Sequence, residues 1–305
     1  MAGFPGSMPG FWAFVDIQEG DFVSFLYGAR VYDLYQVTGK LAGRASDPET
    51  ESHPWKPLRF RSGREYTFPF RLFLRRVRWL EEPIARPEFA YVAENLLLRG
   101  GYYKTHIQAD ALTLGHVSQM GQVVEEDACV SRWEAPGWRT FTPRINVQDR
   151  RSFDRAPEVW PFRELLLQAL VRRKLKTPEV LERLLRWFGL SAEWEWEALG
   201  EKALPQGYVD ILIKPARPQG RNVYIPVEVK LGKAGPADLE QLEAYRRELG
   251  IESRPGMLVA AEFSKRIADH ARRTGIRLIR YSLNSRQNLA SFDELMEGLS
   301  LEWSV

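Results

Sequence analysis

The most informative segment of the sequence is GYVDILIKPARPQGRNVYIPVEVK, residues 207–230. It holds two apolar runs typical of β-strands, joined by a loop rich in proline and glycine. Asp210 stands inside the first run, and the second run ends on Glu228 and Lys230. Because charges in apolar strands are costly to bury unless they are paired or bind an ion, these three residues indicate a site.

Side-chain alternation brings these charges together. Val227 and Val229 are expected on one face of their strand, and Glu228 and Lys230 on the other. If the loop returns the two strands antiparallel, Asp210 lies beside this charged pair. Two carboxylates can hold a hard cation such as Mg²⁺, and a lysine can orient water and offset phosphate charge. The group therefore suits metal-assisted phosphodiester hydrolysis.

The spacing from Glu228 to Lys230 is weak evidence alone, since roughly one acid-x-lysine triplet is expected by chance in such a chain. Its context is more informative, because an acidic strand precedes it and a helix follows. In that helix Gln241 and Tyr245 are four residues apart and share a face. The alternative is an ordinary surface Glu–Lys pair with ordinary helix-surface residues nearby.

The second half has the pattern of a mixed α/β domain. Helices are expected over 158–174, 177–189, 235–250 and 264–275, and strands over 192–199, 208–213, 222–231, 256–263 and 276–283.

Residues 158–283 resemble the PD-(D/E)XK nuclease superfamily, in particular its mismatch-endonuclease branch and related restriction enzymes. The matching pieces are FRELL, GYVDILI, IPVEVK and QLEAY. The resemblance implies that Asp210 and Glu228 bind Mg²⁺ or Mn²⁺ and that Lys230 is the catalytic lysine. It also implies a supporting role for Gln241 and an additional acid at Glu164.

Two positions depart from the family pattern. Val209 replaces the usual proline before the first acid, and Pro226 interrupts the strand that carries Glu228. Because proline has no backbone donor, we expect that strand to be unpaired at Pro226 or to lie near a sheet edge.

The first half is expected to be rich in β-structure from about residue 11 to residue 79, with strands over 21–28, 30–39 and 66–80. A helix is expected over 88–100, where apolar spacing ends at a glycine. Residues 123–157 show no clear period. We therefore expect a domain over 1–122, a linker over 123–157 and a second domain over 158–305.

A basic run lies within the first half. Eight basic residues interleave with aromatic ones there: Lys56, Arg59, Arg61, Arg64, Arg71, Arg75, Arg76 and Arg78. Arginines supply phosphate contacts and aromatic rings supply stacking surfaces, so the run favours nucleic-acid binding. The alternative is a solvated basic face of a sheet. The expected phosphate contacts are Arg59, Arg61, Arg64, Arg71 and Lys233.

Residues 8–120 resemble the EVE branch of the PUA/YTH-like β-barrels, through the turn before FVSFLYG and through LLLRGGYYKTHIQADALTL. The resemblance implies a β-barrel with a pocket for one flipped, often methylated, base. Trp12, Tyr27 and Trp55 are the candidate pocket walls, and each has the alternative of an ordinary core or surface aromatic. Methyl burial gives only about 0.8 kcal/mol, so such a reader must also penalise the unmodified base.

The composition is that of a globular protein with a substantial core. The chain has 305 residues, 44% of them hydrophobic, and a net charge of +3. Its one cysteine, Cys129, excludes an internal disulfide and favours a reducing compartment. No apolar run is long enough to span a membrane, so a cytoplasmic location is expected.

These features together favour a modification-dependent restriction endonuclease of the type IV or IIM kind, which binds modified duplex DNA. One active site cuts one strand, so a homodimer is expected. The alternatives are a mismatch- or structure-selective repair nuclease and a non-catalytic nucleic-acid reader.

Overall fold

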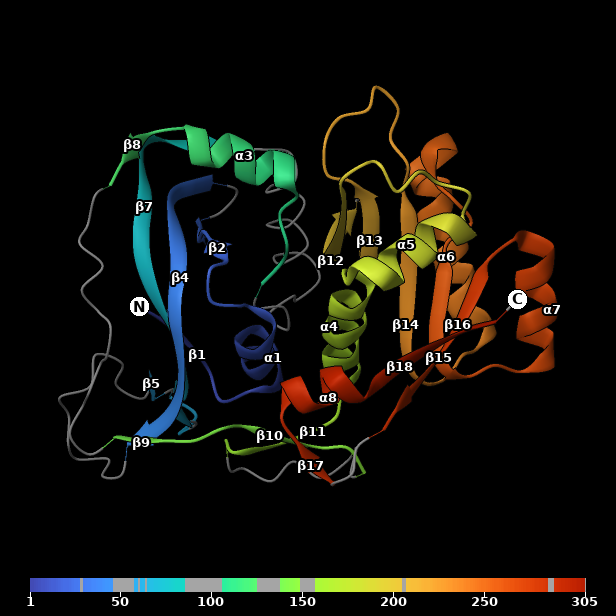
Figure 1. Cartoon of the computed structure of the whole chain (residues 1–305). Helices are drawn as coiled ribbons and strands as arrows, with labels where there is room; N and C mark the ends of the chain where they lie inside the picture. The colour runs from blue at the N-terminus through green and yellow to red at the C-terminus, as the bar shows by residue number, and fades with distance from the viewer. Residues whose placement is uncertain are drawn as a thin grey trace. The chain divides into compact units, whose positions relative to one another are not determined.

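The computed structural model covers the whole chain. It describes residues 1–27, 30–45, 58–59, 61–63, 65–85, 106–124, 138–148, 157–204, 207–284 and 288–304. The chain forms two compact units (Figure 1). The first comprises 1–106, 114–145 and 151–160, and the second comprises 107–113, 146–150 and 161–305. The expected helix over 88–100 lies outside the described residues.

The first unit is built mainly of β-strands around one helix. Its elements are β1 (Ala2–Phe4), α1 (Met8–Asp16), β2 (Phe22–Val23), β3 (Leu26–Tyr27), β4 (Arg30–Ala45), β5 (Leu58–Arg59), β6 (Glu65–Tyr66), β7 (Phe70–Ala85), β8 (Gln122–Val123) and β9 (Trp138–Thr140). Helix α3 (Ala111–Gln119) and strands β10 (Arg144–Asn146) and β11 (Val159–Pro161) contain the points where the chain passes between units.

The main sheet of this unit has the order β1-β7-β4-β2, with β3 and β9 on β4 and β8 on β7. The long antiparallel pair of β4 and β7 forms its centre. Within the described residues the sheet ends at β1 and β2 and does not close on itself. The expected closed β-barrel is therefore wrong for the described part of the unit.

Helix α1 was not expected, since its residues look like part of a β-rich region. Ser7 begins it by accepting a hydrogen bond from the Gly10 amide, and Pro9 lies in the first turn. Because every residue from Phe11 to Asp16 is buried, the helix carries no polar face that would reveal its period. Phe11 stacks on Trp160 at 4.9 Å in the core.

The second unit contains a mixed α/β fold. Its helices are α4 (Glu164–Leu175), α5 (Pro178–Trp187), α6 (Pro236–Leu249), α7 (Lys265–Thr274) and α8 (Phe292–Gly298), with a 3-10 turn η1 (Gly250–Glu252). Its strands are β12 (Trp196–Leu204), β13 (Gly207–Pro215), β14 (Ile225–Lys233), β15 (Met257–Glu262), β16 (Arg277–Leu283), β17 (Leu289–Ala290) and β18 (Leu299–Ser304). The expected order of helices and strands is confirmed from α4 to β16.

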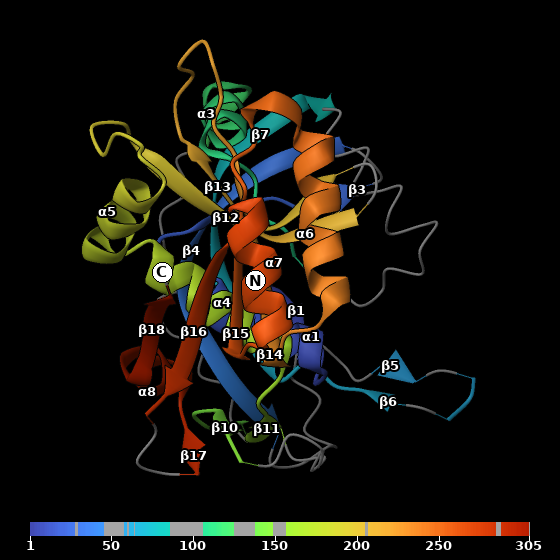
Figure 2. The same cartoon turned by 90° about the vertical axis from the view of Figure 1, so that its right-hand side faces the viewer.

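Six strands form one sheet in the order β12-β13-β14-β15-β16-β18. Strands β14, β15 and β16 are parallel, and their neighbours on both sides are antiparallel. Helix α4 packs on β12 and β14, and Figures 1 and 2 show α6 and α7 on the opposite face of the sheet. The sheet is thus a layer between helices.

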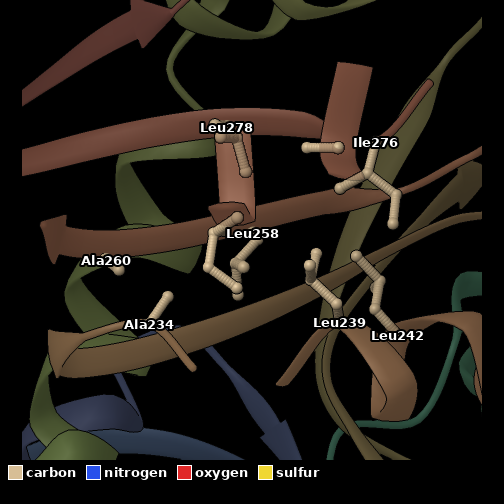
Figure 3. Close-up of a cluster of buried hydrophobic side chains, with 9 residues drawn as sticks. Ala234, Leu239, Leu242, Leu258, Ala260, Ile276 and Leu278 are labelled. Atoms are coloured by element: carbon tan, nitrogen blue, oxygen red, sulfur yellow. The ribbon is translucent and has the colours of Figure 1, made fainter. Parts of the chain in front are cut away.

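An apolar cluster fixes α6 and α7 on their face of the sheet (Figure 3). Its members are Ala234, Leu239, Leu242, Leu258, Ala260, Ile267, Ala271, Ile276 and Leu278. Burying a side chain of the size of leucine contributes roughly 1.5–3 kcal/mol, so the cluster holds the helix that follows β14 firmly in place.

The expectation for Pro226 is confirmed in part: β14 is a central strand and Pro226 pairs with Leu212 of β13, but Pro226 has no pairing partner on β15. The strand can be central because its pairing with β15 begins only at Val227, opposite Met257. The missing donor therefore lies before the parallel ladder starts, where proline is tolerated.

Residues 107–113 belong to the second unit and attach to the outer strands of its sheet. The Gln108 side chain accepts from the Gly200 amide at 2.7 Å, and Glu197 accepts from the Ala111 amide at 3.0 Å. The Lys214 ammonium lies 2.8 Å from Glu197 and 3.5 Å from Asp110. We call this group, Gln108, Asp110, Glu197 and Lys214, the clasp.

Candidate active site

Two neighbouring strands bring the predicted acids together. Ile211 of β13 pairs with Val227 of β14 in an antiparallel register, so Asp210 lies across from Glu228. The Val229 amide donates to Oδ2 of Asp210 at 2.8 Å, which fixes that carboxylate against β14. The predicted return of the two strands is confirmed.

Glu228 and Lys230 lie on the face of β14 that α6 covers. Their partners on β15 are Leu258 and Ala260, which belong to the cluster under α6 and α7. Paired residues of neighbouring strands share a face, so the charged pair lies on that same side. Val227 and Val229 are fully buried on the other side, as alternation predicts.

Glu228 is the most deeply buried acid of this group. Its side chain is 0% exposed, and neither carboxylate oxygen has a hydrogen-bond partner among the described residues, although Lys230 forms an ion pair with it. Burial, and next the charge of Asp210, raise the pKa of Glu228 to about 8, against the opposing effect of Lys230. The site thus holds a carboxylate that lacks enough positive charge around it.

Lys230 lies among three carboxylates. Its ammonium nitrogen is 2.7 Å from Glu228, 3.5 Å from Glu164 and 3.8 Å from Asp238. Burial by itself would lower the pKa of Lys230, but Glu228 foremost, then Glu164 and Asp210, raise this pKa on balance. The lysine is therefore a permanent cation in the site.

The helices that flank β14 contribute the other two acids. Glu164 is the first residue of α4, and its Oε2 accepts from the Leu231 amide at 3.1 Å. Asp238 lies in the first turn of α6, and its Oδ2 accepts from the Gly235 amide at 2.7 Å. Backbone amides therefore orient both carboxylates before any ligand binds.

Gln241 contacts the site through Tyr245. Its amide nitrogen donates to the Tyr245 hydroxyl at 2.7 Å, and that hydroxyl donates to the Tyr208 carbonyl of β13 at 2.6 Å. Burial, with added effects from Glu228 and Asp210, raises the pKa of Tyr245 to about 12. The pair thus ties α6 to the strand that carries Asp210.

The donor set fits a hard divalent cation. In the described ranges, no three His, Cys, Asp or Glu side chains form a ready-made metal cage. Mg²⁺, however, commonly binds to one or two carboxylates and completes its shell with waters and substrate phosphates. Asp210 matches that mode together with the buried Glu228, whose Oε2 has no hydrogen-bond partner among the described residues.

The two predicted base-pocket residues that the structure describes differ in exposure. Trp12 of α1 is 3% exposed and packs its ring on His106 at 4.0 Å, so it has no free face for a base on that side. Tyr27 is 68% exposed. Trp55 lies outside the described residues.

The predicted phosphate contacts differ in exposure. Arg71 is 1% exposed, and its burial argues against the expected phosphate contact. Arg61 and Lys233 are exposed. Arg64 lies outside the described residues, and the side chain of Arg59 is not described.

Sequence reasoning missed an aromatic surface on the first unit. Phe25 packs edge-to-face on Tyr35 at 5.7 Å, and the Arg76 guanidinium lies over the Tyr35 ring at the same distance. Nearby along the chain, Tyr27 packs edge-to-face on Tyr32. The sequence analysis named Tyr27 as a candidate pocket wall and Arg76 as part of the basic run, but it did not identify the other three members. We call Phe25, Tyr27, Tyr32, Tyr35 and Arg76 the aromatic surface.

The chain has low similarity to known proteins. No protein-family model and no curated protein matches the chain. Among solved structures, EndoMS in a complex with double-stranded DNA is 23% identical, with 32% of this chain and 41% of that one covered and a TM-score of 0.23. A repair endonuclease from Pyrococcus abyssi is 21% identical, with 34% and 46% covered and a TM-score of 0.24. The chain spans less than half the length of both.

None of the helices in the described ranges is long and apolar enough to cross a membrane.

Proposed function

We propose that the chain is a DNA endonuclease that depends on Mg²⁺ or Mn²⁺. The observation that carries the proposal is the meeting of Asp210, Glu228 and Lys230 on one face of two adjacent strands. A surface ion pair would not need a fully buried carboxylate whose Oε2 has no hydrogen-bond partner among the described residues. A metal site does, because the cation supplies the missing charge.

Each residue has a role in this proposal. Asp210 and Glu228 would hold the cation, which when bound lowers the pKa of water and offsets charge on the phosphate. Lys230 would place its permanent positive charge beside the attacked phosphate and orient the water. Glu164 would hold the lysine in position, and Tyr245 with Gln241 would fix α6 against β13.

We assign DNA recognition to the first unit, with a flipped and modified base as its ligand. The aromatic surface supports DNA contact, because exposed rings next to arginine are the groups on which unstacked bases bind. Flipping a base costs a few kcal/mol, and each stacked ring can return roughly 1–3 kcal/mol. Selectivity for a modified base rests on the resemblance of residues 8–120 to the EVE branch.

Cleavage of both strands would require two chains, since the described residues of each chain form one such site. We therefore propose that the active form on duplex DNA is a homodimer. Its protein-to-DNA ratio can be measured by analytical ultracentrifugation.

A cleavage panel tests the proposal. The protein is incubated with Mg²⁺ and duplexes that are unmodified, methylated at cytosine, hydroxymethylated at cytosine, methylated at adenine N6 or mismatched. Lys230→Ala should abolish cutting, whereas Lys265→Ala, which removes an exposed lysine of α7, should leave it intact. Cutting of modified duplexes alone supports the full proposal. Cutting of mismatched duplexes alone assigns a repair nuclease, and binding without cutting assigns a reader.

A further inference from the structure

The carboxylates around Lys230 are not equivalent. Glu164 and Asp238 each bind a backbone amide with one oxygen and lie 3.5 Å and 3.8 Å from the ammonium with the other. Glu228 has no such amide and holds the ammonium at 2.7 Å. The shortest contact of the lysine is therefore made to the acid that the proposed cation also needs.

This arrangement creates a competition. Two positive charges bound to Glu228 at close range repel each other strongly, because the buried site excludes water. A cation that binds Glu228 therefore favours movement of the ammonium away from that carboxylate. The available acceptors are the second oxygens of Glu164 and Asp238.

We propose that Asp238 is a positioning residue that receives the Lys230 ammonium when a divalent cation binds Glu228. This inference rests on the proposed function and adds a residue to its site. The lysine exchanges one counter-ion for another and stays charged throughout. In the metal-free protein it contacts Glu228 at 2.7 Å, and in the loaded protein it is held by Glu164 and Asp238.

The Lys230 ammonium has to move only a short distance in this exchange. A charge-assisted hydrogen bond is about 2.8 Å long, so an approach of about 1 Å would convert the 3.8 Å contact with Asp238 into a direct bond. The Gly235 amide keeps the carboxylate oriented, and α6 is held by its apolar cluster. The acceptor is thus fixed before the lysine moves.

A double-mutant cycle with Mn²⁺ tests the exchange without DNA or turnover. The variants are Lys230→Met, Asp238→Asn and the two combined, and the Mn²⁺ affinity of each is measured by isothermal titration calorimetry. Asp238→Asn keeps an oxygen that can accept from Gly235 while it removes the charge. Glu240→Gln removes an exposed charge from the same helix and is the matched control.

We expect Lys230→Met to tighten Mn²⁺ binding roughly tenfold, because the competing cation is gone. Asp238→Asn should weaken binding roughly fivefold when Lys230 is present and less than about twofold in the Lys230→Met background. Glu240→Gln should change little. Melting curves in EDTA establish that each variant is folded.

Two different failures can be told apart. If Lys230→Met does not tighten binding, or if Asp238→Asn has the same effect in both backgrounds, Mn²⁺ binds but the exchange does not occur. If no variant binds Mn²⁺ and the wild type does not cut DNA, the proposed function itself fails and the inference with it.

Discussion

The Lys230 ammonium lies 2.7 Å from Oε1 of Glu228, a side chain with no exposed surface. Even so, the pKa of Glu228 is raised, because burial and Asp210 outweigh the lysine. The metal-free site therefore has too little positive charge to offset its buried carboxylates, and this imbalance lowers the stability of the folded protein.

Glu228→Gln should stabilise the metal-free protein at high pH. The folded-state pKa of about 8 exceeds the ordinary value of 4.5, so the folded protein holds this proton more tightly than the unfolded chain does. The cost of Glu228 is absent below pH 4.5 and grows until about pH 8. In EDTA, the variant should be more stable by a few kcal/mol at pH 8.5 and nearly equal to the wild type at pH 5. Parallel pH profiles of the two proteins would contradict this, and Glu240→Gln serves as the control.

Mg²⁺ should raise the melting temperature of the wild type, and the increase should shrink as the pH falls below about 8, because protons compete for Glu228. Mg²⁺ at a hundred times its Kd adds about 2.7 kcal/mol to the free energy of unfolding. Asp210→Asn should remove most of this gain. An equal increase in both proteins would place the metal elsewhere.

Substitution of Arg71 should affect the stability of the fold, whereas substitution of Arg61 should affect the salt dependence of DNA binding. Arg71 is buried, and burial lowers its pKa to about 10. Arg71→Met should therefore destabilise the fold by roughly 3 kcal/mol, because it leaves the polar partners of Arg71 unsatisfied, and should leave the salt dependence of DNA binding unchanged. Arg61→Ala should keep the melting temperature and reduce the salt slope by about 1. If Arg71→Met alone lowers the slope, the assignment of Arg71 to the core is wrong.

The clasp should contribute measurably to stability. The carboxylates of Glu197 and Asp110 raise the pKa of Lys214 despite its burial, which by itself would lower it. Lys214→Ala leaves two mostly buried acids without their cation and should cost about 3 kcal/mol by urea unfolding. Arg217→Ala breaks an exposed ion pair with Glu195 and should cost less than about 1 kcal/mol. Similar losses in both variants would contradict this difference.

The second unit was largely predictable because its elements have local signals. Pro236 and Gly250 bound α6, and alternation around Val227 and Val229 fixed the charged face of β14. Asp238 was missed, because an acid in the first turn of a helix is ordinary and its contact with Lys230 depends on tertiary packing.

The first unit was less predictable, for physical reasons. An arginine in a strand usually lies at the surface, so nothing local showed that Arg71 is buried. A helix that is buried all round, as α1 is, lacks a polar stripe. The open sheet depends on pairing between distant strands, which periodicity does not specify.

The two units are interleaved along the gene, since residues 107–113 lie between two segments of the first unit but belong to the second, where they form part of the clasp. Neither unit is therefore a single continuous segment that could be separated by dividing the chain at one position. A fragment that starts at residue 158 would lose Asp110 and Gln108. Recombination between homologous genes would keep the α/β fold of the second unit intact only if it carried both segments together.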